Sequence, residues 1–312
     1  MASASVLMSR LMSMMLMVIV GFAAVRLHVI ESRESQTLSR LVIYILQPCL
    51  IFRSFQIQIT SERMYGFAVS MIFGFVVYIF WIVGTMLVKK PLHLDSIDQC
   101  TLIYGNVGNL MLPLVNMMLG SEYVFYASSL QVAFNVFAWT HAQTAISGQR
   151  KISVKKMLLN SNMIAMIVGL LFCLLQIPIP EVIDTAMEGL AAMVGPASML
   201  VIGIVIAGSD LRSVFTSRRA YLISFGRLVV MPFAVLVLLK VSGIFTWHPE
   251  LLPILTVSFI LTCAPPAATI SQLSVLYNKR PFECSQYNVL SMIACVLTMP
   301  LMLALFERVF GL

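Results

Sequence analysis

Charged side chains are scarce in this chain, and their absence sets the first limit on its class. Only 11% of the 312 residues are charged, whereas 60% are hydrophobic, and the mean hydropathy is +0.95. A soluble globular protein carries about 25% charged residues. Because a spanning helix needs about 20 apolar residues, the composition excludes a soluble domain and predicts an all-α polytopic membrane protein.

Motifs that would signal an enzyme or a bound cofactor are also missing. The sequence has no GxxxxGK[ST], HExxH or GxSxG motif, and no carboxylate pair for acid–base chemistry. Its six cysteines form no CxxC pair, so the usual spacing of zinc ligands is absent. We therefore expect no enzymatic activity, no cofactor and no metal site.

Acidic side chains are absent from the middle of the apolar segments. The acidic residues that border these segments are Asp98, Glu122, Asp210, Glu250, Glu283 and Glu307. Proton relays in membranes commonly use buried carboxylates, so the sequence does not show the feature that usually indicates coupling to H+. Na+ could still bind at carbonyl groups exposed by a broken helix, so the coupling ion stays open.

The apolar pattern predicts ten transmembrane helices joined by short connectors. Their expected ranges are 6–25, 37–59, 65–88, 98–119, 122–146, 154–176, 184–208, 219–243, 250–277 and 284–307. The first range also has features of a signal peptide. However, few basic residues precede its apolar stretch, and that stretch is long, so we predict an uncleaved helix.

The basic residues predict the orientation of these helices. Fourteen Lys and Arg residues lie in connectors on one side, five lie on the other, and Arg227 lies inside a predicted span. Cytoplasmic connectors are enriched in Lys and Arg, so the side with fourteen is predicted to be cytoplasmic. Both termini are then extracytoplasmic, the cell membrane is the expected location, and the net charge of +7 does not indicate a nucleic-acid partner.

Two uncharged apolar segments contain residues that interrupt a helix. They are 99–121, with Gly105, Gly108 and Pro113, and 251–278, with Pro265 and Pro266. Proline removes an amide donor and clashes with the preceding turn. A bilayer tolerates non-helical backbone only where protein encloses it, so paired interruptions point to a substrate site near the midplane. For the first segment, a proline-kinked packing helix is the alternative.

Several residue pairs recur at a nearly constant spacing in the two halves. They are Pro113 with Pro265 and Gly74 with Gly226, both 152 positions apart, and Asn135 with Asn288, 153 positions apart. Residues 1–150 and 151–312 are therefore predicted to be two five-helix repeats. Because five is odd, the second repeat enters the membrane inverted, which is an architecture of alternating-access carriers.

Polar or helix-breaking residues at the interruptions are the candidates for substrate binding. They are Asn106, Asn109, Pro113, Pro265 and Pro266, with Asn135 and Asn288 on neighbouring helices. Amides at mid-depth can donate to an anion, and the N-terminal end of a half-helix adds a positive partial charge. Buried amides also bond other helices, so that alternative stays open for Asn135 and Asn288.

Arg227 is the one clear intramembrane charge in the predicted arrangement. Such a charge is a functional candidate by default. Attraction of an anion and structural anchoring are both open for it at this point.

Several short motifs resemble the auxin efflux carrier family over nearly the whole chain. They are Gly21-Phe22, Gln47-Pro48, Gly105-Asn106, Leu112-Pro113, Asn160-Ser161-Asn162, Gly169-Leu170, Arg227-Leu228, Pro265 with Ser271 and Tyr277, and Thr298-Met299-Pro300. Ser161 departs from the pattern, because the family often has proline there.

This resemblance implies two inverted five-helix repeats with broken crossover helices 4 and 9. It implies elevator-type alternating access, with scaffold and transport domains each drawn from both repeats, and a small organic anion such as a mono- or dicarboxylate as substrate. The family's site asparagines correspond to Asn106 and Asn162, and its crossover prolines to Pro113 and Pro265.

The sequence thus predicts a secondary carrier or facilitator of a small organic anion in the lipid bilayer. A homodimer is compatible with this prediction. One alternative is a sodium-coupled symporter with the fold of bile-acid transporters. Another is a membrane receptor that binds the anion without moving it.

Overall fold

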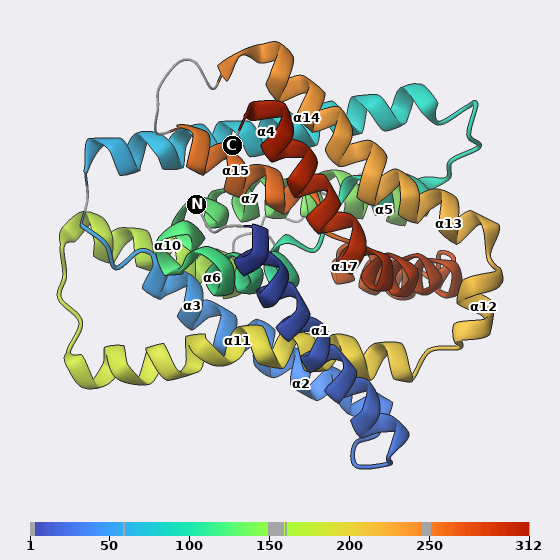
Figure 1. Ribbon diagram of the computed structural model, residues 1–312, viewed down its shortest axis with the longest axis horizontal. Coiled ribbons are helices and arrows are strands. Elements are labelled where there is room, and N and C mark those ends of the chain that lie inside the picture. The colour runs from blue at the N-terminus through green and yellow to red at the C-terminus, as the bar shows by residue number, and fades with distance from the viewer. Residues whose placement is uncertain (1–3, 59, 149–158, 160, 245–250, 312) are drawn as a thin grey trace. The chain divides into compact units, whose positions relative to one another are not determined.

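The structure, a computed structural model, describes residues 4–58, 60–148, 159, 161–244 and 251–311. Its α-helices (Figure 1) are α1 (Ala4–Arg26), α2 (Ser35–Leu41), α3 (Gln47–Ser54), α4 (Ser61–Val88), α5 (Ser96–Ile103), α6 (Leu112–Leu119), α7 (Ser121–Phe137), α8 (Gln143–Ser147), α10 (Ser161–Leu175), α11 (Glu181–Ala207), α12 (Leu211–Thr216), α13 (Arg218–Phe225), α14 (Met231–Ser242), α15 (Leu251–Thr262), α16 (Ala268–Leu276) and α17 (Pro281–Phe310). A 3₁₀ turn, η1 (Ser32–Glu34), and the π-helical turns η2 (Val42–Leu46), η3 (Val107–Met111), η4 (Ala138–Ala142) and η5 (Gly226–Val230) join them. No β-strand occurs within these ranges.

Four helical stretches of the described residues are long and apolar enough to cross a membrane. They are Ser61–Val88, Glu181–Ala207, Arg218–Ser242 and Pro281–Phe310, and shorter apolar stretches are Met15–Arg26, Ser161–Leu175 and Leu251–Thr262. Large apolar side chains such as Ile72 and Leu297 are exposed on them. Extended apolar surface of this kind fits contact with lipid.

The observed helices follow the expected ranges, with differences that have local causes. The range 37–59 is divided into α2, η2 and α3, and the ranges 98–119 and 250–277 are each interrupted. The whole connector 150–156, and the start of the range 154–176, lie outside the described residues.

The chain folds into two compact units, and each unit draws on both halves of the sequence. Unit 1 contains Met1–Ala68, Gly108–Ser129 and Lys155–Ser209, and unit 2 contains Val69–Val107, Leu130–Val154 and Asp210–Leu312. The first interrupted segment is therefore divided. Its N-terminal part belongs to unit 2 and its C-terminal part to unit 1.

In unit 1, α1 and α11 pack together at close range (Figure 1). A Cβ atom added to Gly203 on α11 would overlap the carbonyl oxygen of Val18 and lie 2.7 Å from the amide nitrogen of Phe22. Gly21 on α1 lies in the same way against the carbonyl of Leu200. Small residues let helix backbones approach closely in membrane proteins, so these two glycines permit the α1–α11 contact.

In unit 2, α17 packs against α13 and η5 and also contacts α15 through aromatic rings. The Ser291 hydroxyl on α17 donates to the Ser224 hydroxyl on α13 over 2.8 Å. Phe259 on α15 stacks on Phe306 on α17, with ring centroids 4.6 Å apart. The ring contact anchors α15, the helix that leads into the second interruption.

Three of the π-helical turns in the described part of the chain end two residues before a proline. The turns η2, η3 and η5 precede Pro48, Pro113 and Pro232. A proline cannot donate to the carbonyl four residues earlier and its ring crowds that carbonyl. In each case that carbonyl lies inside the π-helical turn, where the backbone is widened. These prolines therefore coincide with wide turns inside continuing helices.

Candidate functional site

The first interrupted segment leaves helical geometry directly after α5, in unit 2. Tyr104 is extended, with φ −96° and ψ 107°, and its amide donates to the Cys100 carbonyl. The carbonyls of Leu102 and Ile103 stand at the end of α5, where a helix leaves its last acceptors without a helical partner. They need donors from elsewhere in the fold.

The second interrupted segment, also in unit 2, stops α15 at Thr262 and resumes at Ala268 with α16. Pro265 and Pro266 lie between these helices and are buried. Because neither proline has an amide hydrogen, this stretch offers carbonyl acceptors but few donors.

The two interruptions meet as an isolated antiparallel bridge between Gly105 and Pro266. Two backbone hydrogen bonds hold them together, Asn106 N to Pro265 O at 2.7 Å and Ala267 N to Tyr104 O at 2.8 Å. The residues of the bridge are buried. Each interruption therefore satisfies part of the backbone polarity of the other.

Arg227, the second residue of η5, is completely buried in unit 2. Its hydrogen bonds to described residues all go to backbone carbonyls, from Nε to Ala264 (2.8 Å), from Nη1 to Leu102 (3.0 Å) and Ile103 (3.1 Å), and from Nη2 to Thr262 (3.3 Å). The Cζ atom lies 4.7 Å from the ring centroid of Trp81. Within the described residues, no carboxylate forms an ion pair with this guanidinium.

Tyr104 is held through its side chain as well as its backbone. Its hydroxyl donates to the Phe137 carbonyl over 3.1 Å and lies 2.8 Å from Nδ1 of His141. Its ring stacks on Tyr78, with centroids 5.7 Å apart. Contacts from α4, α7 and η4 thus fix the residue whose carbonyl joins the second interruption.

Asn106 and Asn135 offer side-chain amides within unit 2. Asn106 is 5% exposed, and its side chain has no hydrogen bond to a described residue. Asn135 Oδ1 accepts from Gln131 Nε2 over 3.3 Å, whereas its Nδ2 has no partner among the described residues. Both amides can therefore donate to a ligand.

Asn288 on α17 bonds a neighbouring helix. Its Nδ2 donates to the Ser271 hydroxyl on α16 over 2.8 Å, and that hydroxyl lies 3.5 Å from the Cys284 sulfur. Its Oδ1 finds no partner in the described part of the chain. The helix-bonding alternative thus applies to its amide donor, and its acceptor stays available.

Unit 1 contains a second buried amide cluster, formed by Gln47 and Asn162. The Gln47 side chain is completely buried and donates to the Gly108 carbonyl at the start of the C-terminal part of the first interrupted segment. Its Oε1 accepts from Asn162 Nδ2 over 3.1 Å. Asn162 therefore contacts this segment through Gln47.

Pro113 is buried at the start of α6, in unit 1, and does not lie at the interruption itself. The extended residues precede it, at Tyr104–Asn106, and the helix has already resumed through η3 when it reaches this proline. Asn109 lies within η3, but its side chain is outside what the structure describes.

A cluster of charged residues caps the N-terminal end of α5 in unit 2. Asp95 is the N-cap residue, and the buried Asp98 accepts from Arg219 over 2.7 Å. Arg280 forms an ion pair with Asp95. Burial raises the pKa of Asp95, but the hydrogen bond from the Asp98 amide and the nearby Arg280 outweigh it and hold the pKa below its ordinary value.

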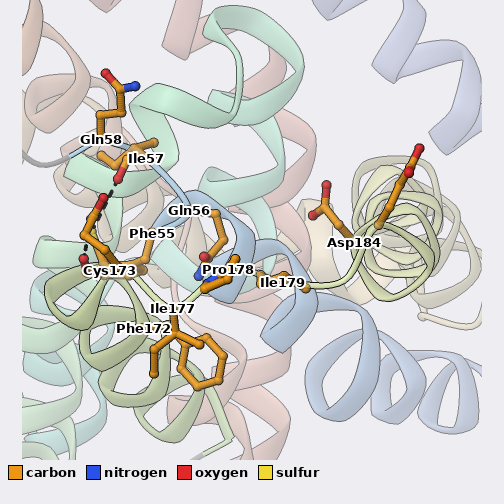
Figure 2. Close-up of a pocket in the computed structure, with 12 residues that line it drawn as sticks. Phe55, Gln56, Ile57, Gln58, Phe172, Cys173, Ile177, Pro178, Ile179 and Asp184 are labelled. Carbon is orange, nitrogen blue, oxygen red and sulfur yellow. Dashed lines mark hydrogen bonds between the residues drawn. The ribbon is translucent and has the colours of Figure 1, made fainter.

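Figure 2 shows a cavity of about 410 Å³ in unit 1, formed by the end of α3, the end of α10 and the start of α11. Gln58 lies on one side of it and Asp184 on the other, and Arg53 donates to Asp184 over 2.9 Å. None of the residues predicted to bind substrate lines this cavity. Its carboxylates make it a poor site for an anion, so we place the candidate site at the interruptions.

The structure therefore brings together four of the predicted residues. Asn106, Pro265, Pro266 and Arg227 meet at the bridge. The sequence did not indicate that Tyr104, His141 and Trp81 support them, or that Gln47 bonds the other part of the first interrupted segment in unit 1. Gln47 could have been noticed in the sequence as a polar residue inside an apolar segment.

Within the described residues, no group of three or more His, Cys, Asp or Glu side chains is placed to hold a metal ion.

Comparison with known families decides the class of this protein. The sequence profile of a family described as membrane transport protein matches residues 6–154 and 146–303. The chain belongs to the auxin efflux carrier family. Membership in the auxin efflux carrier family confirms the resemblance and makes the chain a multi-pass membrane transport protein. No curated protein matches the chain significantly.

Proposed function

We propose that this chain is a secondary carrier of a small organic anion, such as a mono- or dicarboxylate. The observation that supports the proposal most is the antiparallel pairing of two helix interruptions, Tyr104–Asn106 and 263–267. Interrupted helices expose backbone groups that a continuous helix uses internally, and carriers bind their substrates at such groups.

The polarity around the interruptions favours an anion over a cation. Asn106 and Asn135 have amide donors available, and α16 begins directly after the second interruption with its amide end. The N-terminal end of a helix attracts negative charge. The one fully buried carboxylate in the described part of the chain, Asp98, is already paired with Arg219.

The proposed architecture has ten transmembrane helices in two inverted repeats, 1–150 and 151–312, with both termini extracytoplasmic in the cell membrane. The residues proposed to bind substrate are Asn106, Pro265 and Pro266 in unit 2 and Asn109, Asn162 and Pro113 in unit 1. Elevator-type movement would carry one domain past the other. The mixture of both sequence halves in each compact unit supports this scheme.

Flux into proteoliposomes of purified protein tests the proposal. Labelled mono- and dicarboxylates should accumulate more than in empty liposomes, with saturation at rising concentration. Imposed Na+ and pH gradients separate an uncoupled carrier from a sodium symporter. Binding in a thermal-shift screen without any flux would identify a receptor and overturn the carrier.

Asn106→Ala provides the residue-level test, with Asn116→Ala as its control. Asn116 lies on α6, is half-buried and has no side-chain bond to a described residue. We expect Asn106→Ala to lower substrate affinity about tenfold, since a charge-assisted hydrogen bond is lost. Equal affinities in the two variants would contradict a role of Asn106 in binding.

A further inference from the structure

We infer that Arg227 is a positioning residue, which aligns the two interruptions without binding the anion itself. This inference rests on the proposed function, because it concerns the same site. It decides between the two roles that the sequence leaves open for this charge.

The donors of Arg227 are almost fully committed. A guanidinium has five N–H donors, and four of them are directed to the carbonyls of Leu102, Ile103, Thr262 and Ala264 at 2.8 to 3.3 Å. The side chain is 0% exposed, and the Trp81 ring covers one face of it. An anion would have to displace these carbonyls to reach the charge.

The acceptors explain why a charge is stable at this depth. Leu102 and Ile103 end α5, and Thr262 ends α15, so the guanidinium lies at two helix C-termini. Each C-terminus carries about half a negative elementary charge. The two ends together therefore balance one arginine, and a side chain reaching both of them holds the two interruptions in one register.

Gly105 supplies the space that this arrangement requires. A Cβ atom added there would overlap Nη2 of Arg227 and lie 3.0 Å from the Cβ atom of Ala264. Gly105→Ala therefore displaces the guanidinium while leaving its charge in the protein. Gly84 on α4, in the same unit, has no atom within 4 Å of an added Cβ atom, so Gly84→Ala is the matched control.

The test measures KM and kcat for the best-transported carboxylate in liposomes, using Arg227→Lys, Arg227→Gln, Gly105→Ala and Gly84→Ala. A positioning role predicts that Arg227→Lys and Gly105→Ala raise KM about tenfold or more although both keep the positive charge. Arg227→Gln should match Arg227→Lys, and Gly84→Ala should match the wild type. Near-wild-type KM in both Arg227→Lys and Gly105→Ala, with a large loss only in Arg227→Gln, would show direct attraction and overturn the inference.

A measurement on the wild-type protein covers the case in which these variants do not fold. Phenylglyoxal, which modifies accessible arginine side chains, is applied with and without the carboxylate that raises the unfolding temperature most in the thermal-shift screen, and the modified residues are located by mass spectrometry. We expect Arg227 to stay unmodified in both samples. Modification that the carboxylate prevents would place the anion at Arg227 and overturn the inference. Absence of flux for all anions would contradict the proposed carrier but leave this readout intact.

Discussion

Two of the close backbone contacts among the described residues use different chemistry. In unit 1, the intact helices α1 and α11 touch through Gly21 and Gly203. In unit 2, the interrupted segments touch through hydrogen bonds and the buried Arg227. An intact helix has satisfied its own amides and carbonyls, so close approach needs only the removal of side chains. An interrupted helix has left carbonyls open, so its contact needs donors.

Arg227→Met should break the second kind of contact with the largest effect. It leaves up to four buried carbonyls without their donor, at about 1–3 kcal/mol each, so the loss of stability should reach roughly 4 kcal/mol or more. Thermal unfolding in detergent measures it. Lys240→Met on α14 is the control, because Lys240 is exposed, and its contacts with described residues are one hydrogen bond to the Val309 carbonyl and the ring of Phe310. Similar unfolding temperatures for the two variants would show that the contact between the interrupted segments does not need Arg227 as a donor.

Gly203→Ala should break the first kind of contact with a smaller effect. The added Cβ atom would overlap the Val18 carbonyl, and overpacking of this kind costs about 1–3 kcal/mol. Gly189→Ala on the same helix meets no atom within 4 Å, so it should keep or slightly raise stability. Thermal unfolding of the pair, side by side, checks the difference, and equal values would rule out a backbone contact at Gly203.

Gln47→Leu extends the comparison to a neutral donor. In unit 1 the amide of Gln47 donates to the first interrupted segment, whereas in unit 2 the donor is the guanidinium of Arg227. Loss of the Gln47 bond to the Gly108 carbonyl should cost about 1–3 kcal/mol. Asn162→Ala should add little in the Gln47→Leu background, since the two residues share one hydrogen-bonded cluster. Gln56→Leu, a half-buried amide just after α3, is the control. Additive losses in a double-mutant cycle would show that Gln47 and Asn162 act separately.

Asp95→Asn should have the smallest effect and a defined pH dependence. The pKa of Asp95 is lowered in the folded protein, so its contribution is present above the ordinary carboxyl pKa of about 3.9 and is lost as the pH falls through the lower folded value. Asparagine still caps α5. The free energy of unfolding of the wild type should therefore exceed that of the variant by about 1 kcal/mol or less above pH 5. This difference should shrink as the pH falls below about 4.

Asp210→Asn is the control for this pH series. Asp210 is also an N-cap residue, on α12, but it forms no ion pair with a described residue. Its variant therefore removes an N-cap carboxylate without removing an ion pair to a described residue. A gap for Asp95→Asn that stays constant down to pH 3 (roughly) would contradict the assigned titration.

The sequence allowed both interruptions to be located, because glycine, asparagine and paired prolines inside uncharged apolar segments have few other uses. It placed the first one too broadly, since Pro113 lies after the extended residues and begins α6. The partners of Arg227 could not be predicted. They are backbone carbonyls, which every residue has, and the chain separates them from Arg227 by 35 to 125 positions.

The contacts of Gln47 were hidden for a related reason. Its partners Gly108 and Asn162 lie 61 and 115 positions away, and no local periodicity encodes such distances. The residue could have been flagged as an amide inside an apolar segment, but its acceptor could not. A hydrogen bond between two side chains requires two polar residues in the sequence, whereas a bond from a side chain to the backbone requires only one.

The π-helical turn η5 makes the length of this helix as important as its composition. Such a turn holds one more residue than an α-helical turn, and one residue corresponds to about 100° of rotation around a helix axis. If η5 kept its π-helical geometry after deletion of one apolar residue from 228–230, α14 would rotate by about 100° relative to Arg227. If the turn became regular helix instead, α13 and α14 would keep their register, because the deletion would remove the one extra residue that the wide turn holds.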